Sequence, residues 1–346
     1  MMKSSPIWKA IKLLFISFLV LVIITPLLFF LTTAFSSGTD MNKFPKNIFP
    51  TFSQEMKIKH HKDDNYEIFV DEGNGYKSIL TTDSYDELKV HFQRQYNINL
   101  SEDYFEKNIS GIKSGNTKKL TLRKDPFMNF KQFFAIVNNS GDALKNSIIT
   151  SIYTIFISLV LGSMAGYAIA RYDFRFKEQI SQSLLIVRMF PTVGISIPMA
   201  LIMIKLGMFD TRIGLAVIYS IPNIALTSWI TASVFMGINS ELEEASQVFG
   251  ANKLQTFFNI TLPLAFPALA SSSMYAFLTS WNDTISALIL TSNNQTLALV
   301  IYKAIGTTSS GIQYAAAGSV ILILPALVFT FIIRRYINQM WGNVSL

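Results

Sequence analysis

One polar stretch in the second half of the chain carries residues suited to contact a partner protein. It reads ELEEASQVFGANKLQTFFNITLP over residues 241–263. Ser240 followed by Glu243 predicts a capping box, so a short helix is expected to begin at Glu241. Gly250 is placed to end that helix in the left-handed conformation. Glu244 lies at the flank of the helix, where its carboxylate could pair with a basic group of another protein.

The helical periodicity of this stretch predicts which side chains share a face. Leu242, Ala245 and Phe249 fall on one face, and Glu243 and Gln247 are expected to point away from it. After Gly250 a second short helix is expected over Asn252–Asn259. Its apolar side would be formed by Leu254, Phe257 and Phe258. Pro263 then suits the first turn of a following membrane helix, where its missing N–H costs nothing.

Polar side chains inside the apolar segments are a second set of candidates, because ionisable residues at membrane depth are functional by default. Arg188 lies about 12 Å into its segment at 1.5 Å per residue, and Asp283 is expected midway along another. Hydroxyl and amide groups could line a polar pathway, and Trp281 or Tyr219 would offer an aromatic face to a solute. The alternative is hydrogen bonding between helices, which is common in membrane bundles. The candidates for a translocation pathway are Asn223, Tyr275, Ser280, Trp281, Asn282 and Asp283.

Composition and hydropathy predict the elements that position these residues. Half of the residues are hydrophobic, 15% are charged, and the mean hydropathy is +0.36. Soluble domains have about 25% charged residues. Within a bilayer each backbone amide must be satisfied inside its own segment, so apolar segments of this length are helices. Six spans are expected, at about 11–35, 146–170, 180–206, 213–237, 264–290 and 314–333. Pro191, Pro198 and Pro222 are expected to interrupt the third and fourth.

The first apolar segment and the basic residues predict the orientation. The first segment is longer than the apolar core of a signal peptide and no small-residue cleavage site follows it, so it is expected to remain as a span. Lys and Arg in the short loops gather on one side, which predicts that both termini and the loop at 238–263 are cytoplasmic. The net charge of +7 is therefore a signal of topology. No basic face that would indicate a nucleic-acid partner is evident.

Residues 36–145 form a hydrophilic insert that is too long for a simple connection. A β-hairpin is expected from Tyr66–Val70 and Tyr76–Leu80 around a Gly-rich turn. A helix is expected over Ser84–Tyr96, with Ser84 as its N-cap and Glu87 three residues later, and a further strand over Lys118–Arg123. The aromatic segment Phe127–Val137 is expected at the outer membrane interface. Two interpretations of the insert stay open: a spacer, or a dock for an external binding protein.

Metal and thiol chemistry have little support in the sequence. The chain has no cysteine, and its three histidines, His60, His61 and His91, all lie in the insert. The adjacent pair is more typical of solvated loop residues than of a metal site, because no second pair of ligands follows at a usable spacing. We therefore expect no metal.

The spacing of the 241–263 stretch resembles the EAA loop of permease subunits of ABC importers. That signature is Glu-Ala-Ala, three residues, Gly, nine residues, Ile, one residue, Leu-Pro. Every element is in register here except that Ser246 stands at the third position; we call residues 238–263 the EAA loop. Four further segments are similar to the maltose-type branch of the family: Lys145–Ile148, Ala165–Arg171, Met189–Pro191 and Trp281–Asp283.

The resemblance implies a fold class and a function. It implies an all-α polytopic cell-membrane protein of six spans, here with a small α+β extracytoplasmic insert between the first and the second. Such permeases pair with a second permease subunit, two cytoplasmic ATP-binding subunits and an external solute-binding protein. The EAA helices sit in clefts on the ATPases and carry their motion to the membrane. The residues implied for this coupling are Glu241, Glu244, Ala245, Ser246, Gly250, Ile260, Leu262 and Pro263.

The chain itself is expected to bind no cofactor and to be no enzyme. It has no Gly-x-x-x-x-Gly-Lys-Ser/Thr phosphate loop, so ATP would be hydrolysed by partner subunits. The expected divisions are 1–35 (N-terminus and first span), 36–145 (insert), 146–340 (five-helix permease core) and 341–346 (tail). An insert at about 51–125 exceeds the family's usual outer loop. The expected cargo is a sugar or oligosaccharide; a non-sugar solute and an ion-coupled secondary transporter are the alternatives.

Overall fold

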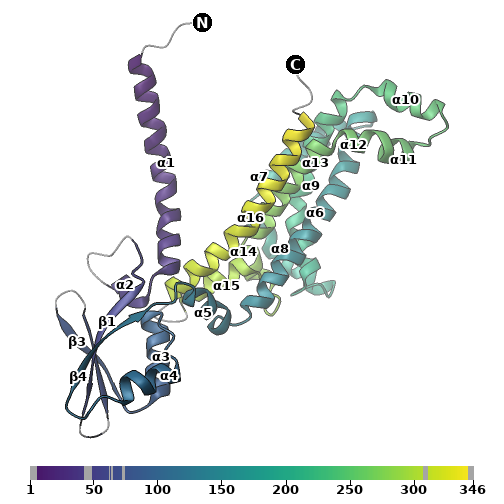
Figure 1. The fold of residues 1–346 in the computed structure, drawn as a ribbon. Coiled ribbons are helices and arrows are strands. Elements are labelled where there is room, and N and C mark those ends of the chain that lie inside the picture. Colours follow the sequence, from purple (N-terminus) through teal and green to yellow (C-terminus); the bar gives the residue numbers. More distant parts are fainter. Residues whose placement is uncertain are drawn as a thin grey trace. The chain divides into compact units, whose positions relative to one another are not determined.

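The computed structural model describes residues 6–42, 49–61, 63, 65–71, 75–306 and 311–341, so most of the expected tail lies outside the described residues. The fold is mostly helical with one small sheet (Figure 1). The chain forms two compact units. The first is Met1–Asn138 with Lys303–Ile321, and the second is Asn139–Tyr302 with Leu322–Leu346.

Among the described residues, four helices are long and apolar enough to cross a membrane without a break. They are Ile11–Phe35 within α1 (Pro6–Phe35), α6 (Ser140–Arg171), α9 (Arg212–Gly237) and Gly311–Arg335 within α16 (Gly311–Trp341). Two bent pairs complete a set of six: α7 (Lys177–Met189) with α8 (Thr192–Lys205), and Lys253–Leu264 with α13 (Phe266–Asn282). The predicted all-α polytopic class with a small insert is confirmed.

The third and fifth spans are each broken by a sharp bend. α7 and α8 meet at 97° around Phe190 and Pro191, since proline disfavours helical backbone in the residue before it. Pro198 and Pro222 lie within α8 and α9 and do not end them. The expected span 264–290 contains two helices, α13 and α14 (Ile285–Leu290), and α15 (Leu297–Ala304) follows it. Asp283 follows the last residue of α13, so the prediction that it lies mid-span was wrong.

The second unit is built around a close crossing of α6 and α9. A Cβ at Gly162 would lie 2.6 Å from Thr227 Cβ, and one at Gly166 would lie 2.0 Å from Thr231 Oγ1. Glycines four residues apart therefore let the two backbones approach, as in other membrane helix pairs. Tyr167 and Arg171 follow on the same helix and are carried to its C-terminal end.

A carboxylate that the sequence did not single out fixes the loop before α15. Asp210 accepts hydrogen bonds from the backbone N–H groups of Ser292, Asn293 and Asn294 at 2.9–3.1 Å. Burial alone would raise the pKa of Asp210, but these N–H donors hold it below the ordinary value. The α8–α9 connection is thereby tied to the segment between α14 and α15.

The insert contains a four-stranded antiparallel sheet of order β3-β2-β1-β4. Its strands are β1 (Ser53–His60), β2 (Tyr66–Asp71), β3 (Tyr76–Thr82) and β4 (Thr117–Arg123). The expected hairpin and third strand are confirmed, although 72–74 of the turn lie outside the described residues. The central strand β1 was missed, because Met56 and Ile58 are its only apolar residues, although buried and charged side chains alternate along it.

Helices complete the insert and its core. α2 (Gly38–Asn42) precedes the sheet; α3 (Tyr85–Tyr96), α4 (Glu102–Phe105) and a π-helical turn (Glu106–Ser110) lie between β3 and β4; α5 (Met128–Ile136) follows. The predicted helix over 84–96 is confirmed, but Ser84 makes no side-chain capping bond, and Glu87 accepts a hydrogen bond from Thr82 instead. The core comprises Met56, Ile58, Ile68 and Val70 of the sheet with Leu88, Phe92 and Tyr96 of α3.

A buried ion pair joins α2, which follows α1, to the residue after β4. Lys124 Nζ donates to Asp40 Oδ2 at 2.8 Å, with both side chains at most 3% exposed. Ser37 and Thr51 donate to the two oxygens of the same carboxylate. Burial would raise the pKa of Asp40, but the ammonium of Lys124 outweighs it and keeps the pKa low. Since every polar atom of the pair has a partner, the insert is held to the segment that follows α1.

Replacing Lys124 with Met should loosen this junction. The carboxylate of Asp40 would stay buried without its cation, which costs about 3–5 kcal/mol. Amide hydrogen exchange of the full-length protein in detergent should therefore speed up in α2, β1 and β4. Lys131→Met is the matched control, because it removes an ion pair from an exposed lysine. Exchange that rises equally in both variants would contradict the role of the buried pair.

Candidate functional site

The EAA loop forms two short helical segments that project from the ends of α6, α9 and α13 (Figure 1). The first, α10 (Ser240–Val248), is capped by Asn239, whose Oδ1 accepts from the N–H of Glu241 at 3.1 Å. The expected capping box of Ser240 and Glu243 is therefore wrong, and the helix begins one residue earlier. Gly250 has φ +91°, in the left-handed region that a Cβ would penalise.

After Gly250 the chain returns as one bent helical run. Asn252 and Gln255 form a reciprocal capping box at the start of α11 (Lys253–Thr256). A π-helical turn, Phe257–Thr261, and α12 (Leu262–Leu264) follow. Pro263 lies in the first turn of α12, and the membrane helix α13 starts only at Phe266 after a bend of 76°. Ile260, Leu262 and Pro263 are half-buried there.

Glu243, which was expected to point away from the face of Leu242, Ala245 and Phe249, does so and is the buried residue of α10. Its carboxylate pairs with the guanidinium of Arg171 at 2.8 Å and accepts a hydrogen bond from Tyr167 at 2.9 Å. Arg171 also donates to the carbonyl of Ile238 at 3.0 Å. Burial would raise the pKa of Glu243, but these donors outweigh it and hold the pKa below its ordinary value of 4.5. We call Glu243, Arg171 and Tyr167 the latch, because they fasten α10 to the end of α6.

Ser246 joins the two helical segments of the loop. Its hydroxyl lies 2.7 Å from the hydroxyl of the fully buried Thr256 and 2.8 Å from the carbonyl of Glu243. Alanine at this position could make neither contact. The departure from Glu-Ala-Ala therefore has a local structural reason, since it gives the buried hydroxyl of Thr256 a partner.

Large apolar side chains of the loop face solvent. Val248 and Phe249 are 85% and 91% exposed. Phe257 packs instead between Tyr167 and Phe235, with ring centroids 4.8 and 6.2 Å away. Glu241, Glu244 and Ala245 are exposed as well. The exposed apolar surface of the loop consists of Leu242, Val248, Phe249, Leu254 and Phe258.

Polar groups of α9 and α13 form a second cluster. Tyr219 donates to Asp283 at 2.9 Å, and the same carboxylate oxygen accepts from the N–H groups of Ser286 and Ala287. The side-chain amide of Asn223 donates to the hydroxyl of Thr279 at 2.8 Å. The structure thus brings together two of the six pathway candidates, Asn223 and Asp283, through partners on the facing helix.

The other four candidates fall on two sides of α13. Ser280 and Trp281 are buried: Ser280 donates to Ser151 of α6, and Trp281 Nε1 donates to the carbonyl of Leu322. Tyr275 and Asn282 are exposed. Ser280 and Trp281 therefore serve helix packing here, while Tyr275 and Asn282 lie on an open face.

Residues 158–342 match the family described as "Binding-protein-dependent transport system inner membrane component". That segment is more than half of the chain. The chain belongs to this family. It is therefore an inner-membrane permease component of a binding-protein-dependent ABC importer, and transport rather than catalysis is its role.

Relatives of this permease cover most of its length. It is 33% identical over 239 residues to the trehalose transport permease SugB of Mycobacterium tuberculosis, covering 67% of this chain and 84% of the relative. The arabinooligosaccharides permease AraQ of Halalkalibacterium halodurans is 32% identical, over 63% of this chain and 79% of AraQ. A chain of a bacterial ABC transporter that imports the acidic polysaccharide alginate superposes with a TM-score of 0.65 and 17% identity, covering 97% of this permease and 98% of that chain. The last likeness shows the fold, the insert included.

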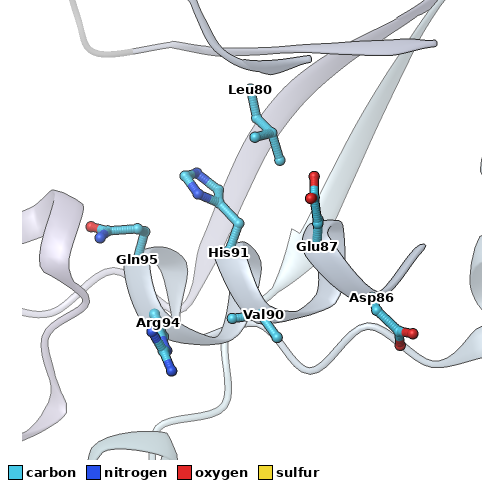
Figure 2. A pocket seen from close by; sticks show the side chains of 7 residues that line it. All are labelled: Leu80, Asp86, Glu87, Val90, His91, Arg94 and Gln95. Atoms are coloured by element: carbon cyan, nitrogen blue, oxygen red, sulfur yellow. The ribbon is translucent and has the colours of Figure 1, made fainter. Parts of the chain in front are cut away.

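The insert of the permease has a shallow groove of about 540 Å³ along α3. Figure 2 shows His91 and Glu87 directed toward Leu80 of the neighbouring strand, with Asp86 and Arg94 directed away. Burial lowers the pKa of His91, so its ring is neutral at pH 7. Few polar groups converge in this groove, and we assign it no ligand.

The adjacent histidines bond to separate protein groups. His60 Nδ1 lies 2.6 Å from the carbonyl of Ile112, and His61 Nε2 lies 2.8 Å from Glu67 Oε2. No group of three or more His, Cys, Asp or Glu side chains is placed to hold a metal ion within the ranges that the structure describes. His60 ends β1 and is not a loop residue, in contrast to the expectation.

Glu243→Gln should release α10 of the permease from α6. The guanidinium of Arg171 would remain buried without a carboxylate, at a cost of about 3–5 kcal/mol. Hydrogen exchange of the α10 amides in the detergent-solubilised protein should accelerate accordingly. Glu244→Gln is the control; since Glu244 is exposed, its loss should change stability by no more than about 0.5 kcal/mol.

The latch should also respond to acid with a defined sign. Because the folded state lowers the pKa of Glu243, its stabilisation is complete above the ordinary value of 4.5 and is lost as the pH falls below it. Exchange of α10, corrected for the intrinsic pH dependence, should rise only below that pH in the native protein. Loss of protection near neutral pH would contradict the assignment.

Proposed function

We propose that this permease imports a saccharide, driven by ATP hydrolysis in partner subunits that bind the EAA loop. The observation that carries the proposal is the apolar surface at the tip of a loop whose base is fixed by the latch. Side chains as exposed as Val248 and Phe249 are costly in water, and such surfaces mark contacts with a partner. The proposal places both termini and the EAA loop on the cytoplasmic side of the membrane.

The loop residues divide into an anchoring set and a contacting set. Glu243, Ser246 and Gly250 shape the loop, and the half-buried Ile260, Leu262 and Pro263 join it to α13. Glu241, Glu244 and Ala245 are exposed beside the apolar surface, where the carboxylates can pair with basic groups of an ATPase cleft. Movement of the ATPase would pull on the latch and so on the end of α6.

The proposed assembly contains a second permease subunit, two ATP-binding subunits and a solute-binding protein. Residues 146–340 would form the translocating core, and the insert at 36–145 would be an accessory domain. The names of SugB and AraQ, which refer to trehalose and arabinooligosaccharides, support a saccharide as cargo. The exposed face of α13 supports it too, since hydroxyl and amide groups suit sugar hydroxyls. A non-sugar solute is the alternative.

Gly250→Val should abolish saccharide uptake while membrane insertion persists. Valine in the left-handed region costs about 1–3 kcal/mol, so the turn between α10 and α11 would open and displace the apolar surface. The measurement is uptake, by cells expressing the complete transporter, of labelled neutral saccharides (trehalose and maltotetraose) and acidic ones (tetragalacturonate and a glucuronate-bearing xylotetraose). Gly237→Val, at a helical glycine with no atom within 4 Å of an added Cβ, should leave uptake intact. Normal uptake in the Gly250 variant would remove the coupling role of the loop.

Glu244→Lys should weaken binding of the ATPase subunits, because a lysine would meet the basic groups expected to bind this carboxylate. The measurement is the amount of ATPase subunit that co-purifies with the tagged permease in mild detergent. Glu178→Lys reverses an exposed charge at the start of α7 and should leave co-purification unchanged. Equal recovery from both variants would show that Glu244 makes no such contact.

A further inference from the structure

The broken third span contains an arginine that pairs with no acidic side chain among the described residues. Arg188 lies in the last turn of α7, and its Nη2 donates to the hydroxyl of Tyr275 on α13 at 3.3 Å. The guanidinium carbon lies 5.1 Å from the centre of the Tyr275 ring. Within the part of the chain that the structure describes, no acidic side chain forms an ion pair with Arg188.

Both helices extend well past their first residues before they reach this contact. Tyr275 follows the first residue of α13, Phe266, by nine residues, which is about 14 Å at 1.5 Å per residue. Arg188 follows the first residue of α7, Lys177, by eleven residues, which is about 17 Å. The hydrocarbon core is about 30 Å thick. A charge at this depth must face water or protein, because lipid does not solvate it.

The face of α13 beside Arg188 is polar along its length. Ser271, Tyr275, Thr279 and Asn282 follow one another at intervals of three or four residues and share one side of the helix, and none of them is buried. Phe277, Ser280 and Trp281 are buried on the other side. The cation therefore borders a continuous row of hydroxyl and amide groups, as a hydrated pathway requires.

The nearest carboxylate along this row does not neutralise the cation. Asp283 lies eight residues beyond Tyr275, which is about 12 Å along the axis of α13. Its Oδ2 already accepts from Tyr219 and from two backbone N–H groups. Arg188 thus remains an uncompensated positive charge beside a row of neutral donors and acceptors.

We infer that Arg188 and Tyr275 bind an anionic group of the transported solute, a carboxylate, sulfate or phosphate on a saccharide. The guanidinium offers paired N–H donors that match such an anion, and the hydroxyl of Tyr275, which accepts from Arg188, keeps its own proton free to donate. Neutral hydroxyls of the solute would bind the row on α13. This inference rests on the proposed import of a saccharide and narrows its substrate class to acidic saccharides.

Uptake from a defined mixture tests the inference in cells that express the complete transporter. The mixture contains two neutral saccharides, trehalose and maltotetraose, and two acidic ones, tetragalacturonate and a glucuronate-bearing xylotetraose. Mass spectrometry of the medium follows their depletion. Native cells should deplete an acidic saccharide, and Arg188→Gln should slow that depletion by about tenfold or more, the effect of losing a hydrogen bond to a charged group. Arg188→Lys, which keeps the charge, should retain at least a third of the rate.

Lys205→Gln is the matched control, since it removes an exposed cation from the other helix of the same broken span. It should not change the rate. Depletion of neutral saccharides alone, or of an acidic one at equal rates by native and Arg188→Gln cells, would overturn the inference and leave the proposed saccharide import intact. Depletion of none by native cells would contradict both.

In the one remaining explanation, an acidic group of the second permease subunit pairs with Arg188. Co-purification of that subunit distinguishes this explanation from binding of a solute anion. If Arg188→Gln lost this subunit together with uptake, the charge would be neutralised across the subunit interface, and a solute anion would be excluded as its partner. Unchanged co-purification with slowed depletion of the acidic saccharide supports the inference.

Discussion

The close crossing of α6 and α9 is the constraint on which the second unit depends. Lipid provides no hydrophobic force between helices, so their association requires direct contact between surfaces. Gly162 and Gly166 provide it by leaving room for Thr227 and Thr231 of α9. Because Arg171 follows Gly166 by five residues on the same helix, the crossing also decides where that guanidinium lies. A shift of α6 against α9 would move the latch with it.

The base of the EAA loop is buried at the latch, whereas its tip is exposed. At its base, Glu243 is buried and bonded to Arg171 and Tyr167, and Phe257 packs against the same tyrosine. At its tip, Phe249 and Val248 are almost fully exposed. A buried ion pair adds little net stability but is directional, so it specifies one orientation of the helix that carries it. The loop can therefore receive force at an apolar surface and pass it to α6 through a charged, geometrically fixed contact.

The sequence predicted those features whose signal is local or periodic. Apolar length located the six spans, alternation located β2–β4, and spacing placed Gly250 at a left-handed turn. The sequence did not predict that Glu243 is buried, because the partners that bury it lie on α6, more than 70 residues earlier. Periodicity likewise identified a face formed by Leu242, Ala245 and Phe249 without telling whether this chain or another covers it.

The surroundings of Asp283 and Arg188 likewise could not be predicted from the sequence, because their partners lie on other helices. Both residues lie at breaks in the membrane helices. A helix that ends within the bilayer leaves carbonyls unpaired, and these need water or neighbouring polar groups. Arg188 stands where α7 ends, and Asp283 stands where α14 begins. An anion is favoured at a helix N-terminus, and Asp283 accepts hydrogen bonds from two N–H groups at the start of α14. The guanidinium of Arg188, in the last turn of α7, contacts Tyr275 instead. The breaks and the charges thus coincide: one break supplies the donors that hold Asp283, and the other leaves Arg188 beside the polar face of α13.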